Sequence, residues 1–135
     1  MIIFAQCQNR GAVKSFPIII CTTNELIRVC PERIVYICSD GNYSTMVLHD
    51  ETEQVFSFNL SHFQQIIEKQ MKEKAALFIR IGKSLIINRE YIYKINIGRQ
   101  VLVLADMKIE HAFTLSASKE ALRQLKQLLE NEIES

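Results

Sequence analysis

The chain lacks a hydrophobic run long enough to cross a membrane. A helical span needs about 18 or more consecutive apolar residues, and no stretch of this sequence reaches that length. The first residues, MIIFAQCQNRGAVK, also lack a basic segment followed by an apolar one, which argues against a secretory signal peptide. We therefore expect a cytoplasmic protein without membrane contact.

The sequence also lacks the spacing of metal ligands and of disulfide frameworks. None of the four cysteines forms a CxxC pair, and the three histidines stand far apart. His62, for example, is followed at the i+4 position by Ile66 and not by a second ligand. We expect no metal, no cofactor and no disulfides, and we interpret the cysteines as buried, inert thiols in a reducing cytosol: Cys7, Cys21, Cys30 and Cys38.

Motifs of catalysis are missing as well. No serine lies in a GxSxG elbow, so nothing supports a Ser/His/Asp triad. Gly82-Lys83-Ser84 is similar to the end of a phosphate-binding loop, but Leu77 stands where the first glycine should be, and strand-forming residues follow instead of a long helix. We expect no enzyme. The remaining enzymatic alternative is a reactive cysteine, because only the thiols offer a nucleophile.

A strong excess of one charge is absent. The formal net charge is only +1, which argues against indiscriminate binding to polyanions. The charge is unevenly distributed, because residues 78–99 hold five basic residues and one acidic residue, a net +4 that leaves −3 for the remainder. We weigh two explanations of this asymmetry equally, a local positive face and chance.

What the chain does have is the composition of one folded domain. Its 135 residues are 48% hydrophobic and 23% charged, enough to bury a core with little to spare for a second domain. Residues 1–16 show no clear period and precede Pro17, so we interpret them as an N-terminal leader, ordered or disordered, outside the domain. The domain itself is expected to span residues 17–135.

Strand-forming residues dominate the sequence, above all in residues 78–96, where β-branched and aromatic residues show no helical stripe. Asp40-Gly41 suits the positive φ of a tight hairpin and has strand-forming runs on both sides. In all, about ten short strands are expected in a mainly β fold. They are residues 18–21, 25–29, 34–38, 43–48 and 53–58, several within 78–96, then 101–104 and one ending near 113–115.

Two segments, residues 60–71 and residues 122–133, have the period of an amphipathic helix instead. In the first, apolar residues recur at helical spacing after a candidate N-cap at Asn59 or Ser61. The C-terminal segment repeats this spacing after a candidate cap at Ser116 or Ser118. Because an acidic residue such as Glu132 is unfavourable at the negative end of a helix dipole, we expect this second helix to fray at its end.

Three polar turns carry hydrogen-bond donors but little bulk: residues 40–43, residues 82–84 and residues 116–119. Each is adequately explained as a turn or a helix cap, and taken singly we favour that structural interpretation. They are nevertheless the candidates for a binding site that remain once metal and catalytic sites are set aside.

Three blocks of the sequence resemble one known family. In order, YICSDGNYS, FIRIGKSLIINREYIYKI and FTLSASKEALRQLKQLL resemble the LytTR family of bacterial DNA-binding domains, and the resemblance covers residues 18–130. Its central signature is an aromatic residue, an arginine two residues later, a serine, an asparagine four residues after the serine, and a tyrosine or hydrophobe before isoleucine. In this chain these are Phe78, Arg80, Ser84, Asn88, Tyr91 and Ile92.

The resemblance implies an elongated fold of antiparallel β-sheets with two short helices. It also implies that loops, rather than a recognition helix, bind DNA by reaching successive major grooves on one side of the duplex. The family's DNA-contacting loops correspond to the three polar turns. The residues expected to bind DNA are therefore Asp40, Asn42, Tyr43, Arg80, Gly82, Lys83, Ser84, Ser116, Ser118 and Lys119.

The chemistry of these side chains suggests two roles. Lysine can donate to guanine O6 or N7 and asparagine can pair with adenine, so Lys83 and Asn42 suit base reading in the major groove. The remaining donors would more naturally hold phosphates and set the register of the protein on the duplex: Arg80, Ser84, Ser116 and Lys119.

The chain departs from the family pattern in two loops. Gly82-Lys83 stands where members commonly carry His-Arg or His-Asn, and Ala117 stands where they commonly carry an arginine. A base-reading arginine is thus missing unless Lys119 substitutes for it, which puts the target sequence in question but leaves the fold intact. Relatives often carry a phosphorylatable receiver domain of ~100–130 residues, and residues 1–16 are too few for one.

We interpret the chain as a stand-alone transcriptional regulator that binds double-stranded DNA sequence-specifically, as a homodimer or on paired sites. Without a receiver domain, its signal would come from expression level or from a signalling protein partner. The alternative is a protein-interaction module on a LytTR fold with weakened or lost DNA binding, which the low net charge favours.

Overall fold

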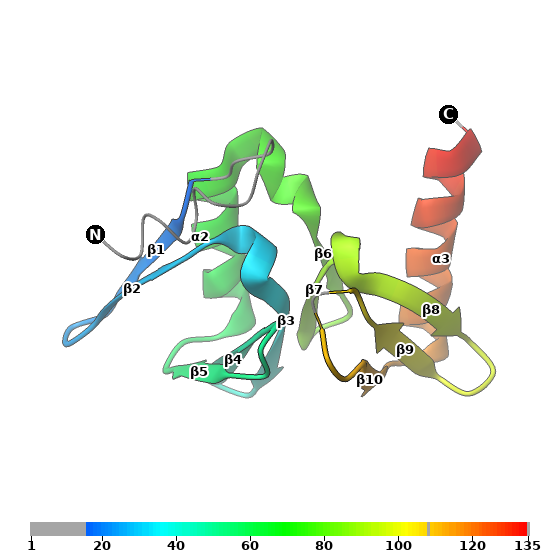
Figure 1. Ribbon diagram of the computed structural model, residues 1–135, viewed down its shortest axis with the longest axis horizontal. Coiled ribbons are helices and arrows are strands. Elements are labelled where there is room, and N and C mark those ends of the chain that lie inside the picture. The colour runs from blue at the N-terminus through cyan, green and yellow to red at the C-terminus, as the bar shows by residue number, and fades with distance from the viewer. Residues whose placement is uncertain (1–15, 108, 135) are drawn as a thin grey trace.

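A five-stranded antiparallel sheet, in the order β5-β4-β3-β7-β6, forms the centre of the protein (Figure 1). The computed structural model describes residues 16–107 and 109–134, so the expected leader lies outside the described residues except for the exposed Phe16. The strands of the central sheet are β3 (Ile34–Asp40), β4 (Tyr43–Leu48), β5 (Glu53–Phe56), β6 (Phe78–Ile81) and β7 (Leu85–Asn88).

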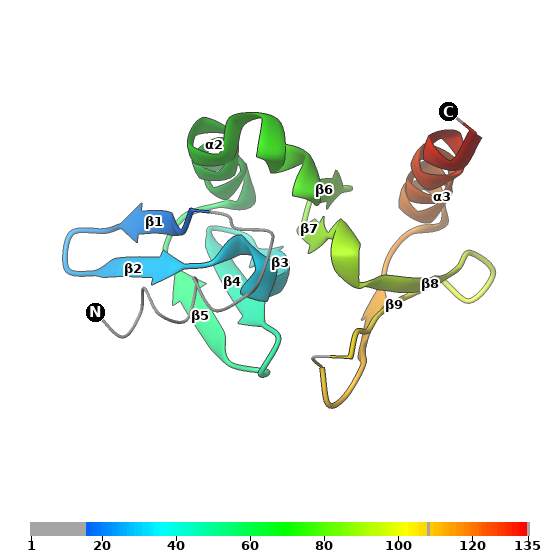
Figure 2. The same ribbon diagram turned by 45° about the horizontal axis from the view of Figure 1, so that its top comes forward.

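Two smaller antiparallel sheets flank the central one. The N-terminal hairpin pairs β1 (Ile18–Cys21) with β2 (Leu26–Val29), and it reaches away from the other strands in Figure 2. The third sheet has the order β10-β9-β8. Its strands are β8 (Ile92–Asn96), β9 (Val101–Leu104) and β10 (Phe113–Ser116).

The helices lie on opposite sides of β6 and β7 in both views (Figures 1 and 2). They are α2 (Leu60–Met71) and α3 (Lys119–Glu134), and three short 3-10 turns accompany them: η1 (Pro31–Arg33), η2 (Lys72–Leu77) and η3 (Arg89–Tyr91). The expected caps are confirmed, because Asn59 Oδ1 accepts from the backbone N–H of His62 at 2.9 Å and Ser118 Oγ accepts from that of Ala121 at 3.1 Å. Within residues 16–107 and 109–134, ten strands and two α-helices confirm the mainly β fold.

Both faces of the central sheet are buried, each against one hydrophobic cluster. Successive residues of a strand point to opposite faces. In β3 this alternation is interrupted by a register shift between Ile34 and Tyr36, so Ile34 and Ile37, three residues apart, join the same hydrophobic cluster, together with Ile86 of β7. Val35 and Ile87 belong to a second cluster on the other face.

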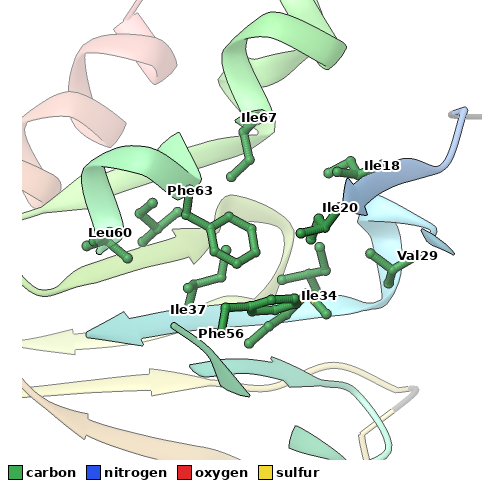
Figure 3. Close-up of a cluster of buried hydrophobic side chains, with 11 residues drawn as sticks. Ile18, Ile20, Val29, Ile34, Ile37, Phe56, Leu60, Phe63 and Ile67 are labelled. Atoms are coloured by element: carbon green, nitrogen blue, oxygen red, sulfur yellow. The ribbon is translucent and has the colours of Figure 1, made fainter. Parts of the chain in front are cut away.

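The first cluster is closed by α2 and the β1–β2 hairpin (Figure 3). Phe63 of α2 is fully buried, and its ring meets that of Phe56 edge-on with 5.4 Å between the centroids. From the hairpin, Ile18 and Ile20 point into the same cluster, as Figure 3 shows. This packing fixes α2 against the sheet.

The second cluster is closed by the three-stranded sheet and α3. Leu102 and Leu104 of β9 and Leu122 of α3 are fully buried in it. Tyr36 of the central sheet meets Phe113 of β10 edge-on, with 5.6 Å between the ring centroids. The third sheet and α3 are therefore packed on the central sheet and not separate from it.

Two residues of the family signature serve the fold. The Asn88 amide is fully buried, donates to the backbone carbonyl of Ile34 at 2.9 Å and accepts from the N–H of Glu90 at 2.9 Å. The Tyr91 hydroxyl donates to the carbonyl of Glu32 at 2.6 Å. These bonds tie η1 to η3 and satisfy buried polar groups.

The helix α3 continues to Glu134, and the Glu132 carboxylate accepts two hydrogen bonds of 2.6 Å from the Arg89 guanidinium. One expectation needs correction, because the cysteines are not uniformly buried free thiols. Cys21 is exposed and free, Cys38 is half-buried and free, and Cys30 is buried but disulfide-bonded.

Candidate nucleic-acid interface

The turn between β3 and β4 presents three of the expected DNA-binding side chains. Asp40 and Asn42 are exposed, and 57% of the Tyr43 surface is accessible. Gly41 between them has a φ of +68°, which glycine adopts without steric cost. The Asp-Gly signal thus produces the expected tight hairpin with its polar side chains outward.

The turn between β6 and β7 lies directly beside the first. Gly82 has a φ of +61°, and Lys83 and Ser84 are exposed. The backbone N–H of Ser39 donates to the carbonyl of Ser84 at 2.9 Å, which extends the pairing of β3 with β7 to the two turns. We call residues 40–43 and 82–84 the first loop pair.

Arg80 lies next to the first loop pair but points into the protein. Its Nη1 donates to Ser61 Oγ at 3.1 Å and to Gln64 Oε1 at 2.9 Å, both on α2. Its Nη2 donates to the backbone carbonyl of Lys83 at 3.0 Å. The half-buried guanidinium therefore connects a helix to the turn.

The third expected turn, residues 116–119, lies beside the hairpin turn between β8 and β9. The N–H of Ala117 donates to the carbonyl of Gln100 at 3.2 Å, and the Gln100 amide returns a bond of 3.5 Å to the carbonyl of Ala117. Ser116 and Lys119 are exposed, whereas Ser118 caps α3. We call residues 97–100 and 116–119 the second loop pair.

The structure thus distributes the three expected turns over two places. The first loop pair ends the five-stranded sheet and the second ends the three-stranded sheet, and both lie on the lower side in Figure 1. Sequence reasoning missed that the turn with Arg99 and Gln100, both exposed, is hydrogen-bonded to the turn of residues 116–119 through Gln100 and Ala117. The available signal was Arg99, in the most basic segment of the chain and between the strands expected within residues 78–96 and at 101–104.

The basic side chains of residues 78–99 divide into two kinds. Arg80 and Arg89 are bonded to other parts of the fold, the latter to Glu132 and the carbonyl of Ala76. By contrast, the exposed side chains of Lys83, Lys94 and Arg99, and that of Lys119 outside this segment, make no hydrogen bond or ion pair within residues 16–107 and 109–134. Each loop pair therefore offers free positive charge to an anion.

The thiol nearest to the first loop pair is not poised as a nucleophile. Burial raises the pKa of Cys38 above its usual value, and the negative charge of Glu53 raises it further. A raised pKa keeps the thiol protonated at neutral pH, and the protonated form is a poor nucleophile.

In the described part of the chain, no three His, Cys, Asp or Glu side chains gather as a metal site would require. No helix of residues 16–134 is long and apolar enough to span a membrane.

Comparisons with known proteins agree with this geometry. The family described as "LytTr DNA-binding domain" matches residues 24–130. Among solved structures, the chain is similar to the LytTr DNA-binding domain of a Bacillus cereus protein described as a methyl-accepting/DNA response regulator, with a TM-score of 0.59 and 18% identity over 85% of this chain and 97% of that one. No curated protein matches the sequence.

Proposed function

The chain belongs to the LytTR family of DNA-binding domains, and from this premise we propose that it binds specific double-stranded DNA sequences through its loop pairs and so regulates transcription. The observation that carries the proposal is the arrangement of exposed turns at the ends of two sheets packed on each other, each with free cationic side chains. Neither α2 nor α3 is needed as a recognition helix in this arrangement.

In the proposal, the first loop pair reads bases in a major groove. Lys83 can donate to guanine O6 or N7, and Asn42 can pair with the N6 and N7 atoms of adenine. Both side chains are exposed on neighbouring turns joined by the hydrogen bond between Ser39 and Ser84. A fixed distance between the two turns would allow both to engage neighbouring base pairs.

In the proposal, the second loop pair binds the DNA phosphate backbone at a neighbouring position along the duplex. Lys119 and Arg99 supply charge for phosphates, and the Ser116 hydroxyl can donate to a phosphate oxygen. Such contacts set the register of the protein on DNA but carry no sequence information themselves. With Ala117 in place of an arginine, base reading rests on the first loop pair.

We further propose that the protein acts in the cytosol, binds as a homodimer or on paired sites, and takes its signal from a protein partner. The family membership supports a regulator of DNA. A related domain of known structure belongs to a protein described as a response regulator, which supports control by a signal. A second candidate function is a protein-interaction module that has lost DNA binding, favoured by the net charge of only +1.

The test is fluorescence anisotropy of the purified protein on duplex DNA from upstream of its own gene, and on sequences selected from random DNA. We expect saturable binding that exceeds binding to random competitor and weakens steadily as salt increases, because phosphate contacts release counterions. Lys69→Ala, at an exposed position of α2, serves as the control that leaves binding unchanged. If no selected sequence is preferred over random DNA, the interaction-module alternative replaces the proposal.

A further inference from the structure

We propose that Arg80 is a positioning residue for DNA binding: its guanidinium clamps the carbonyl of Lys83 to α2 and so fixes the turn that presents the Lys83 side chain. The inference deepens the proposed function and rests on it. It assigns to Arg80 a role other than the phosphate contact that its residue type suggests.

The hydrogen bonds of Arg80 carry the proposal. Two of them reach Ser61 and Gln64 on α2, at 3.1 and 2.9 Å, and the third reaches the Lys83 carbonyl at 3.0 Å. A guanidinium is planar and offers several donors in fixed directions, so it can hold a helix and a turn at one distance. A lysine at this position would offer only a compact ammonium group.

The helix side of this clamp is rigid. Leu60 and Phe63, which precede and follow Ser61 on α2, are fully buried in the first cluster (Figure 3). Gln64 follows Phe63 directly, so the backbone that carries its side-chain acceptor Oε1 belongs to a packed turn of helix, and its Nε2 donates to Glu68 Oε2 at 3.1 Å. Arg80 therefore connects the Lys83 carbonyl to a helix that is packed on the hydrophobic core.

The turn side of the clamp is the part that needs support. Gly82 has a positive φ and nothing within 4 Å of the place where a Cβ would lie, so local side-chain packing does not hold it. Only two residues separate Gly82 from the start of β7 at Leu85. The bond from Arg80 to the Lys83 carbonyl and the bond between Ser39 and Ser84 thus tie this turn to its surroundings, beyond the pairing of β6 with β7.

A direct phosphate contact by Arg80 would leave the phosphate only the donors that these bonds do not use. The three bonds take both Nη1 hydrogens and one Nη2 hydrogen, so only the Nε hydrogen and the second Nη2 hydrogen remain for a phosphate while the turn stays supported. Lys83, in contrast, is exposed, and its ammonium has no partner in the described part of the chain. In the proposal, Arg80 therefore positions the turn and Lys83 contacts DNA.

The first test uses the free protein, without DNA. Amide hydrogen exchange of Ser39 reports on its bond to the Ser84 carbonyl, at the base of the turn. We expect Arg80→Gln to accelerate exchange at Ser39, with a smaller acceleration in Gln64→Ala, while Arg123→Gln, at an exposed position of α3, leaves it unchanged. Exchange at Ser39 that is equal in Arg80→Gln and the unchanged protein would overturn the positioning role.

The second test separates positioning from phosphate contact on a preferred duplex. We expect Arg80→Gln and Arg80→Lys to weaken binding by a similar factor, about tenfold, with the slope of log affinity against log salt unchanged. Loss of a phosphate contact lowers that slope by about one, which is the expectation for Lys119→Ala. A lower slope in Arg80→Gln together with full affinity in Arg80→Lys would establish a direct contact instead and contradict the proposal.

The two tests fail separately. If the unchanged protein prefers no DNA sequence, the proposed function fails and the role of Arg80 in DNA binding fails with it. Hydrogen exchange in the free protein still decides whether Arg80 orders the turn. Thermal unfolding of each variant, measured in parallel, shows whether a loss of binding comes from the turn or from loss of the fold.

Discussion

The two loop pairs stand on the same molecule but are held in different ways. In the first pair, the β3–β4 and β6–β7 turns are joined by the bond of 2.9 Å between Ser39 and Ser84, and Arg80 ties the second of these turns to α2. In the second pair, the β8–β9 turn and the turn after β10 are joined by longer bonds of 3.2 and 3.5 Å. A tightly held pair suits base reading, which depends on geometry, whereas phosphate contacts tolerate adjustment.

The largest expected effects concern the cores behind the two pairs. Phe63→Ala in the first cluster should lower the free energy of unfolding by about 3–5 kcal/mol, and Leu122→Ala in the second by about 2–5 kcal/mol, because both side chains are fully buried. We expect urea unfolding of both variants to remain a single transition, because β3 and β7 contribute residues to both clusters.

Gln65→Ala, at an exposed position of α2, is the control for these core substitutions and should change the free energy of unfolding by less than about 0.5 kcal/mol. Two separate unfolding transitions in either core variant would show that the two halves are independent. The comparison between the loop pairs would then become one between two domains.

DNA binding should distinguish the pairs directly. Lys83→Ala should weaken binding to the preferred sequence by about 1–3 kcal/mol and reduce the preference over random DNA, because a base contact is lost. Lys119→Ala should weaken binding to preferred and random DNA alike. Anisotropy titrations of both variants on both kinds of duplex measure this difference, and an equal loss of preference in the two variants would remove the proposed distinction.

A smaller effect is expected at the start of α3. Ser118→Ala removes the hydroxyl that accepts from the N–H of Ala121, and should lower the free energy of unfolding by about 1 kcal/mol. Ser116→Ala, in the same turn but outside the cap, is the matched control. Chemical denaturation measures stability, and anisotropy then shows whether Ser116 contributes to DNA binding. If both substitutions have the same effect on stability, the cap is not what holds the second loop pair.

The smallest expected effect on stability concerns Asp50, which lies outside both loop pairs. In the turn before β5, hydrogen bonds from the hydroxyl and the N–H of Thr52 hold the pKa of Asp50 below its usual 3.8, with help from Arg33. The stabilisation is therefore present above the unfolded-state pKa and is lost as the pH falls through the lower folded-state value.

Asp50→Asn should lower stability slightly at neutral pH and match the unchanged protein in strong acid, as measured by urea unfolding across pH. The effect is small because the Asp50 side chain is 44% exposed and screened by solvent. A difference between the two proteins that persisted in strong acid would show that the Asp50 charge is not its source.

Much of the fold follows from local pattern. The Asp-Gly turn, both helices and the caps at Asn59 and Ser118 lie where the sequence predicts them, because each depends on residues close together in the chain. Boundaries were less accurate: β5 ends at Phe56 and not at residue 58. In the β8–β9 hairpin, the positive φ falls on Gln100 and not on Gly98.

The sequence by itself determined the class of fold, the family and the set of exposed polar turns, because strand alternation, helical period and turn chemistry act over a few residues. Only the tertiary structure decided that three turns make two loop pairs, that Arg99 and Gln100 belong to the second, and that Arg80 points inward. These facts depend on contacts between segments far apart in the chain, such as Arg80 with α2 and Ser39 with Ser84. Such contacts form only when the buried faces of the central sheet have brought the segments together.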